Sequence, residues 1–167
     1  SHLAIAEKEA DITVRELRAL CDSLSSPWLD LGLKEALAEL ADRLSRSLGL
    51  EISVEMTEGC DLPRETVLAL FRVAQEAINN AARHGRAKHV LVRGFVEDDE
   101  LVMEVSDDGC GFNPTDDVEL LRVKGHRGMA NMKERIALIG GRFEVKSYPD
   151  KGTSVICRIP LACNVSR

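Results

Sequence analysis

The sequence predicts an α+β fold: a two-layer α/β sandwich with a mixed, mostly antiparallel sheet, helices on one face and a further helix at the N-terminus. Helical and strand-like segments occur in mixed order along the 167 residues, with a hairpin among the strands, and this order favours helices packed on one face of a sheet. The hydrophobic content of 44% is sufficient for one well-filled core at this length.

The first element expected is an amphipathic helix between Leu3 and Leu24. Its apolar residues recur at three- and four-residue spacing among charged ones: Ala10, Val14, Leu17, Cys21 and Leu24. Pro27 ends this helix, because proline disfavours a helical residue before it and lacks an N–H to donate. The narrow apolar stripe suits packing against a partner helix.

Two helices and a strand are expected next. Leucines at helical spacing predict a helix from Leu33 to Leu48, and Gly49 suits the left-handed residue that ends many helices. Polar and apolar residues alternate over 51–56, which predicts a half-buried strand. Pro63 suits the first turn of a long helix that reaches about Arg83.

Strands dominate the second half of the chain. Strands over 90–96 and 101–105 are joined by an acidic turn, which predicts a hairpin. Residues 109–128 show no clear period, and a loop of this length is usually a functional lid or a mobile segment. Helical spacing resumes over 129–139 and stops at two glycines, and the last two strands are expected over 142–147 and 153–160.

Composition excludes several functions. The net charge is −6 and the aromatic residues are one Trp, one Tyr and four Phe, so nucleic acid is not an expected partner. The five cysteines form no C-x-x-C pair, which predicts reduced thiols and a cytoplasmic domain. No apolar run approaches the roughly 20 residues that span a bilayer, although a longer parent protein could still be membrane-anchored.

The segment FRVAQEAINNAARHG carries the first candidate site. On a helical wheel, Glu76, Asn80 and Arg83 lie opposite an apolar face, and His84 lies at the edge of the polar one. A solvated polar face is the plain alternative. However, two consecutive asparagines are unfavourable inside a helix, and Asn and Glu oxygens beside an Arg suit a cation next to a phosphate.

The second candidate site is Asp107-Asp108-Gly109-Cys110-Gly111, directly after a strand. It is either a glycine turn with solubilising acids or a site where Gly109 and Gly111 allow a flat ligand to approach the backbone. The carboxylate of Asp107 can only accept hydrogen bonds, so its natural ligand partner is an exocyclic amine.

Two further segments resemble ligand-binding turns. Gly125-His126-Arg127-Gly128-Met129 leads into a helix, whose first N–H groups can bind an anion. Residues 151–154, Lys-Gly-Thr-Ser, form a tight turn into the last strand, and a simple hairpin turn is the alternative.

Taken in order, these four segments resemble the ATP-binding sites of the superfamily that includes gyrase, heat-shock protein 90, histidine kinases and mismatch-repair ATPases. QEAINNAARH resembles the N-box, DDGCGF the first glycine box, GHRGMANMKERI the second, and GGRFEVKSYPDKGTSVICRIP the closing strands. The similarity covers about residues 33–160 and implies a Bergerat-type ATP-binding fold. Within the superfamily, the sequence is most similar to sensor histidine kinases of the nitrate-sensor and desaturase-thermosensor group.

This resemblance implies ATP and Mg²⁺ as ligands. Asn80 would ligate the Mg²⁺ that bridges the phosphates, and Arg83 and His84 would lie near the phosphates and ribose. Asp107 would accept from the adenine amino group, and the nearby Asp108 would add negative charge near the phosphates.

It also implies roles for the remaining motif residues. Gly109 and Gly111 would shape the adenine wall, and Thr153 would hold the Asp107 end of the pocket through water or its hydroxyl. Glu76 is the best catalytic candidate. The end of the lid would contact the phosphates through Gly125, His126, Arg127, Gly128 and Met129.

The resemblance finally divides the chain. Residues 1–30 are expected to be a remnant of the second dimerisation helix and its linker, 31–162 the ATP-binding domain, and 163–167 a tail. The domain would transfer the γ-phosphoryl of ATP to a phosphoacceptor His outside this chain, for relay to a response regulator. The parent kinase would be a homodimer. The chain itself is therefore not expected to autophosphorylate. The alternatives are an ATPase or anti-sigma-type serine kinase of the same superfamily, or a non-catalytic nucleotide-dependent interaction domain.

Overall fold

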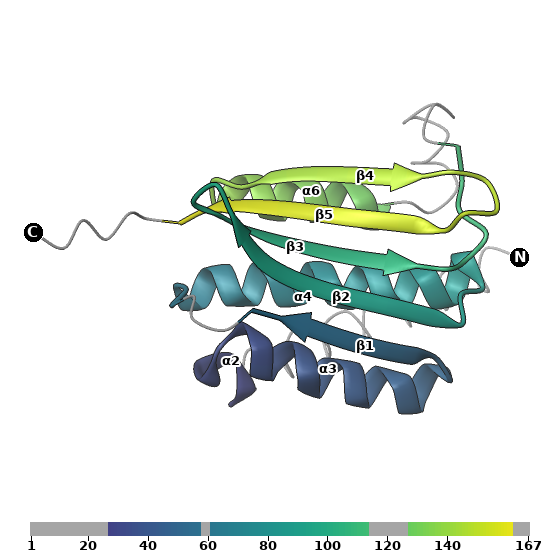
Figure 1. Ribbon diagram of the computed structural model, residues 1–167, viewed down its shortest axis with the longest axis horizontal. Helices are drawn as coiled ribbons and strands as arrows, with labels where there is room; N and C mark the ends of the chain where they lie inside the picture. The colour runs from purple at the N-terminus through teal and green to yellow at the C-terminus, as the bar shows by residue number, and fades with distance from the viewer. Residues whose placement is uncertain (1–26, 58–60, 114–126, 162–167) are drawn as a thin grey trace, which may run out of the picture.

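The computed structural model describes residues 27–57, 61–113 and 127–161. A five-stranded sheet with strand order β1-β2-β3-β5-β4 forms one layer, and the helices lie together on one of its faces (Figure 1). The expected α+β sandwich is therefore confirmed. The helix expected over 3–24 and the tail over 163–167 lie outside the described residues.

The first described elements follow the sequence pattern closely. Helix α3 (Leu33–Leu48) ends at Gly49, whose φ of 66° is left-handed, as predicted. Its leucine stripe is buried, and β1 (Glu51–Met56) lies at the predicted position. A short helix not expected from the sequence, α2 (Trp28–Leu31), precedes α3 and buries Leu29.

The long central helix changes its winding near its end. Helix α4 (Arg64–Asn80) begins directly after Pro63, and its chain continues as a π-helix, η1 (Ala81–Gly85). The predicted apolar face is confirmed, since its members are at most 3% exposed: Val67, Phe71, Ala74, Ile78 and Ala81. The wider turn of η1 was not predicted from the sequence. Such π-helical turns are rare in proteins, and those that occur are often found at functional sites.

Strands β2 (His89–Glu97) and β3 (Glu100–Asp107) form the predicted hairpin and are slightly longer than predicted. Asp98 and Asp99 at its turn have φ of 50° and 61°, the left-handed pair that suits the twist of a tight hairpin. Strands β1 and β2 pair in parallel, and the other strand pairs are antiparallel.

The C-terminal elements complete the sandwich. Helix α6 (Arg127–Leu138) begins two residues before the predicted periodic segment, whereas β4 (Arg142–Ser147) and β5 (Thr153–Pro160) have the predicted bounds. Strand β5 lies between β3 and β4, so the ends of β3 and β4 and the start of β5 meet at one edge of the fold. Among the residues described, no helix is long and apolar enough to cross a membrane.

Candidate functional site

A cavity opens between α4, η1 and α6 on one side and the end of β3 and the start of β5 on the other. Its volume is about 140 Å³. The residues that line it come from all four predicted motifs and from the apolar core: Ala77, Asn80, Ala81, His84, Gly85, Val105, Asp107, Gly111, Phe112, Met129, Thr153 and Val155. The motifs that resembled an ATP site are thus brought together.

Asp107 is the half-buried carboxylate of this cavity. Its Oδ1 accepts a hydrogen bond from the Gly109 N–H at 2.8 Å, and the backbone N–H of Thr153 donates to the same carboxyl group. Burial raises the pKa of Asp107, and the two N–H donors partly oppose this rise. The carboxyl group is therefore held by backbone in a fixed orientation and remains available as an acceptor toward the cavity.

Thr153 contacts the surroundings of Asp107 through both its side chain and its backbone. Its hydroxyl lies 2.8 Å from the Ser147 hydroxyl, whereas its backbone N–H donates to Asp107. Thr153 and Asp107 line the same cavity, and the Thr153 hydroxyl is bonded to Ser147.

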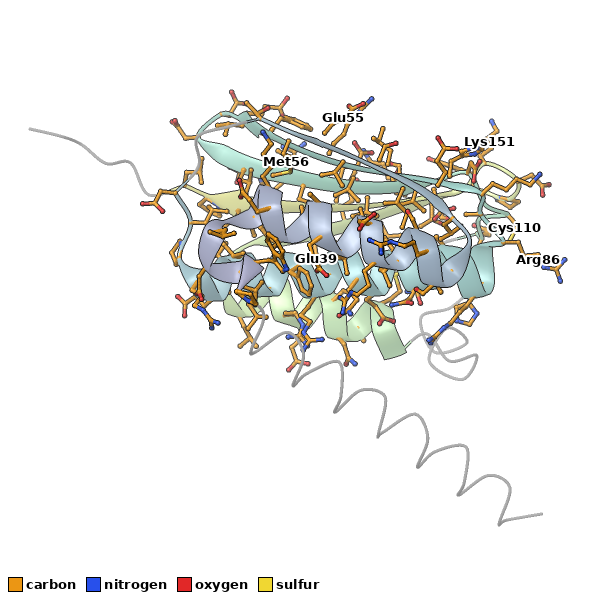
Figure 2. The ribbon with its side chains drawn as sticks, turned by 90° about the horizontal axis from the view of Figure 1, so that it is seen from below. Glu39, Glu55, Met56, Arg86, Cys110 and Lys151 are labelled. Carbon is orange, nitrogen blue, oxygen red and sulfur yellow. The ribbon has the colours of Figure 1, made fainter. Side chains whose placement is uncertain are left out.

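Glycine is needed where the motif segments cross. A Cβ at Gly109 would overlap the carbonyl of Gly85, and a Cβ at Gly111, whose φ is 58°, would overlap the carbonyl of Tyr148. Between them, the Cys110 N–H donates to the Gly85 carbonyl at 2.7 Å, which joins the glycine box to η1. Figure 2 shows Cys110 at one end of the molecule, near Arg86 and Lys151.

Asp108 is not among the residues that line the cavity, and its carboxylate is bonded to the start of β2. Its Oδ1 accepts from the N–H groups of Lys88 and His89, and its Oδ2 lies 2.6 Å from His89 Nδ1. These hydrogen bonds lower the pKa of Asp108 to about 2, and the same contact raises the pKa of His89. Asp108 therefore anchors the glycine box to the start of β2.

The polar residues of α4 and η1 divide between two places. Asn80 and His84 line the cavity, while Arg83 is exposed and is not among the lining residues. Glu76 is half-buried and packs against α6, where a Cβ at Gly128 would overlap its carboxylate. Glu76 therefore lies beside the first turn of α6.

Helix α6 carries the described part of the lid motif. Met129 lines the cavity and Gly128 contacts Glu76. Arg127 begins the helix, but its side chain is outside the described part of the chain, as are Gly125 and His126 entirely.

Several cavity residues were not singled out from the sequence. Ala77, Ala81, Val105 and Val155 form its apolar walls together with Phe112 and Met129. In the sequence the first four follow the same helix and strand periodicity as the core, so no local signal separates a cavity wall from a core position.

The donors available to a metal ion are few. Over the described ranges, no group of three or more His, Cys, Asp or Glu side chains could hold a metal. The amide of Asn80 at the cavity offers a hard oxygen of the type that Mg²⁺ prefers. This donor set fits an ion held mainly by ligand phosphates, with one protein oxygen.

The structure defines an α+β domain with a cavity lined by all four motifs, and comparisons with known proteins identify its family. A model described as histidine kinase-, DNA gyrase B-, and HSP90-like ATPase matches residues 65–162. The chain belongs to this family.

Individual relatives agree with this assignment. Sensor protein VraS of Staphylococcus aureus (strain COL) is 33% identical over 160 residues, which are 95% of this chain and 44% of VraS. The chain therefore spans less than half of this curated relative.

Solved structures share the fold. The histidine kinase domain of the Erythrobacter litoralis EL346 blue-light activated histidine kinase has a TM-score of 0.66 at 24% identity, covering 78% of this chain and 61% of that one. Full-length ShkA in complex with AMPPNP has a TM-score of 0.63 at 19% identity, covering 76% and 29%.

Proposed function

We propose that this chain is the ATP-binding catalytic domain of a sensor histidine kinase. The observation that carries the proposal is one cavity lined by an acceptor carboxylate, Asp107, and by the hard oxygen of Asn80. These are the groups that an adenine amine and a phosphate-bound cation require. The related fold of ShkA in complex with AMPPNP, an ATP analogue, supports the same ligand.

The adenine would lie at the Asp107 end of the cavity. Its amino group would donate to the carboxylate that the Gly109 and Thr153 N–H groups hold. The apolar walls and the glycine backbone around Gly111 would cover its faces. The base would thus be recognised by one polar contact, by the apolar walls and by close backbone approach.

The phosphates would lie toward η1 and α6. Asn80 would ligate Mg²⁺, which neutralises phosphate charge when bound, and His84 would lie near the phosphates or ribose. Arg83, which is exposed beside this end, would contribute long-range positive charge. The backbone of Gly125–Met129 would complete the phosphate contacts at the start of α6.

Glu76 is the proposed catalytic group. Its carboxylate lies against Gly128 in the first turn of α6. From there it would accept a proton from, or polarise, the phosphoacceptor His as the γ-phosphoryl is transferred. Most of the catalysis would come from positioning and charge neutralisation, because phosphoryl transfer needs little covalent help.

The parent kinase and its partners follow from the same proposal. We infer a homodimeric parent, possessing a phosphoacceptor His outside residues 31–162, that relays the phosphoryl group to a response regulator. We place the domain itself in the cytoplasm, with residues 1–30 as part of its dimerisation helix and linker.

Calorimetry of the 167-residue chain with ATP, with and without Mg²⁺, tests the binding proposal. One ATP should bind per chain, more tightly with Mg²⁺. Phosphate release then separates the classes: a histidine kinase domain without an acceptor should turn over very slowly, whereas an ATPase that uses Glu76 as base should release phosphate steadily. No heat and no rise in melting temperature at millimolar Mg-ATP would count against both enzyme classes and leave an interaction domain that binds a partner without ATP.

A further inference from the structure

Ser147, the last residue of β4, holds a buried hydroxyl that is bonded to two residues of the cavity lining, Phe112 and Thr153. It is 1% exposed. The inward-facing residues before it on β4, Phe143 and Val145, are apolar members of the core boundary. A polar side chain at this position therefore departs from the pattern of its own strand.

The hydroxyl of Ser147 makes three hydrogen bonds. It accepts from the Phe112 N–H at 2.9 Å and donates to the Gly152 carbonyl at 3.1 Å, and the Thr153 Oγ1 lies 2.8 Å away. A serine hydroxyl has one proton and two acceptor positions. Since its proton goes to Gly152, the Thr153 hydroxyl must be the donor to Ser147, and the hydrogen-bonding capacity of Ser147 is complete.

Two of these partners, Gly152 and Thr153, contact Asp107, and Phe112 lines the same cavity. Phe112 and Thr153 line the cavity, and the Thr153 N–H donates to the Asp107 carboxyl group. Gly152 packs so closely that a Cβ there would overlap the backbone oxygen of Asp107. Any displacement of the turn at 148–153 therefore moves the groups that orient the Asp107 carboxylate.

We propose that Ser147 is a positioning residue for base recognition: its hydroxyl locks the glycine box to the turn between β4 and β5 and thereby fixes the carboxylate of Asp107 toward the base. This inference rests on the proposed ATP site. In this proposal, a residue outside the cavity lining helps the site to distinguish purines that have an exocyclic amine at C6 from those that lack one.

The test compares Ser147→Ala with the unmodified chain. Dissociation constants are measured by calorimetry for Mg-ATP and for the Mg complex of purine riboside triphosphate, which has hydrogen in place of the amine. Loss of one well-placed hydrogen bond corresponds to a factor of about 3 to 10 in binding. We expect the preference for ATP to fall by about this factor, through weaker ATP binding, while the analogue binds within about twofold of its original affinity.

Ser154→Ala is the matched control. The Ser154 hydroxyl lies 2.7 Å from the hydroxyl of Ser106 on the adjacent strand β3. Because side chains alternate along a strand, Ser154 lies on the opposite face of the sheet from Thr153. Its preference for ATP should stay within about twofold. An unchanged preference in Ser147→Ala, an equal loss for both nucleotides, or an equal change in Ser154→Ala would overturn the proposal.

A second variant covers a failure of Ser147→Ala to fold. Thr153→Val removes only the hydroxyl that donates to Ser147 and keeps the backbone N–H toward Asp107, so the preference should fall in the same direction but by less. A preference equal to that of the unmodified chain contradicts the proposal. If the unmodified chain binds ATP and the analogue equally, the proposed base site itself is wrong; if it prefers ATP and Ser147→Ala keeps that preference, only the role of Ser147 is wrong.

Discussion

Replacing Asp107 with asparagine tests the base site, because the two side chains have the same shape but different hydrogen-bonding groups. Two backbone N–H groups, those of Gly109 and Thr153, already donate to Asp107. We expect the asparagine oxygen to take the place of Oδ1, which accepts from the Gly109 N–H, so that its NH₂ group faces the cavity. There the NH₂ group and the adenine amine are both hydrogen-bond donors, so the hydrogen bond between the side chain and the base is lost. This loss costs about 1 to 3 kcal/mol, or roughly a 10- to 100-fold loss of ATP affinity.

The same geometry predicts a change in nucleotide preference. Inosine triphosphate carries an oxygen at C6, which repels the carboxylate of Asp107 but can accept from the asparagine NH₂. Calorimetry with Mg-ATP and Mg-ITP should therefore show weaker ATP binding and tighter ITP binding in Asp107→Asn. Asp108→Asn is the matched control, since it removes the same charge one residue away at a side chain that does not line the cavity. ATP affinity within twofold of the original in Asp107→Asn, or an equal loss in the control, refutes the assignment.

Three further predictions address the surroundings of the site. The Asp108–His89 pair should stabilise the fold most between about pH 4 and 6.5. The pKa of Asp108 is lowered, so its contribution to stability is lost as the pH falls toward 2. The pKa of His89 is raised, so its contribution is lost as the pH rises above 6.5. The melting-temperature difference between the unmodified chain and Asp108→Asn should peak in that window; a constant difference from pH 5 to 9 contradicts the pairing. Gly128→Ala should displace Glu76 and slow phosphoryl transfer to a separately supplied acceptor domain by up to about 100-fold, and an unchanged rate excludes Glu76 as the catalytic group in this position. Asn80→Ala should remove the Mg²⁺ enhancement of ATP binding, and calorimetry showing the same enhancement excludes Asn80 as the ligand.

Local patterns predicted most of the secondary structure correctly. Helix α3 and strands β4 and β5 have the predicted bounds because hydrophobic period and glycine positions agree there. The parallel pairing of β1 with β2 and the π-helical turn η1 were not predicted. Both depend on contacts between distant segments, such as the Cys110 N–H bond to the Gly85 carbonyl, which no local period reveals.

The site shows the same division. Asn80, Asp107 and Thr153 were found from motif order, since each belongs to a segment with an unusual local composition, and the cavity brings them together. Ser147 was not found, because one serine at the end of an alternating strand resembles an ordinary strand boundary. Its importance lies in three hydrogen bonds to residues 35, 5 and 6 positions away. The two shorter-range bonds close the turn between β4 and β5, and the sequence does not reveal the geometry of that turn.

A structure of the chain with Mg²⁺ and a non-hydrolysable ATP analogue tests the central claim most directly. The adenine amine should lie within hydrogen-bonding distance of the Asp107 carboxylate, and Mg²⁺ should bridge the phosphates and the Asn80 amide oxygen. A base bound elsewhere, or one whose amine points away from Asp107, would contradict the account of this cavity as the ATP site.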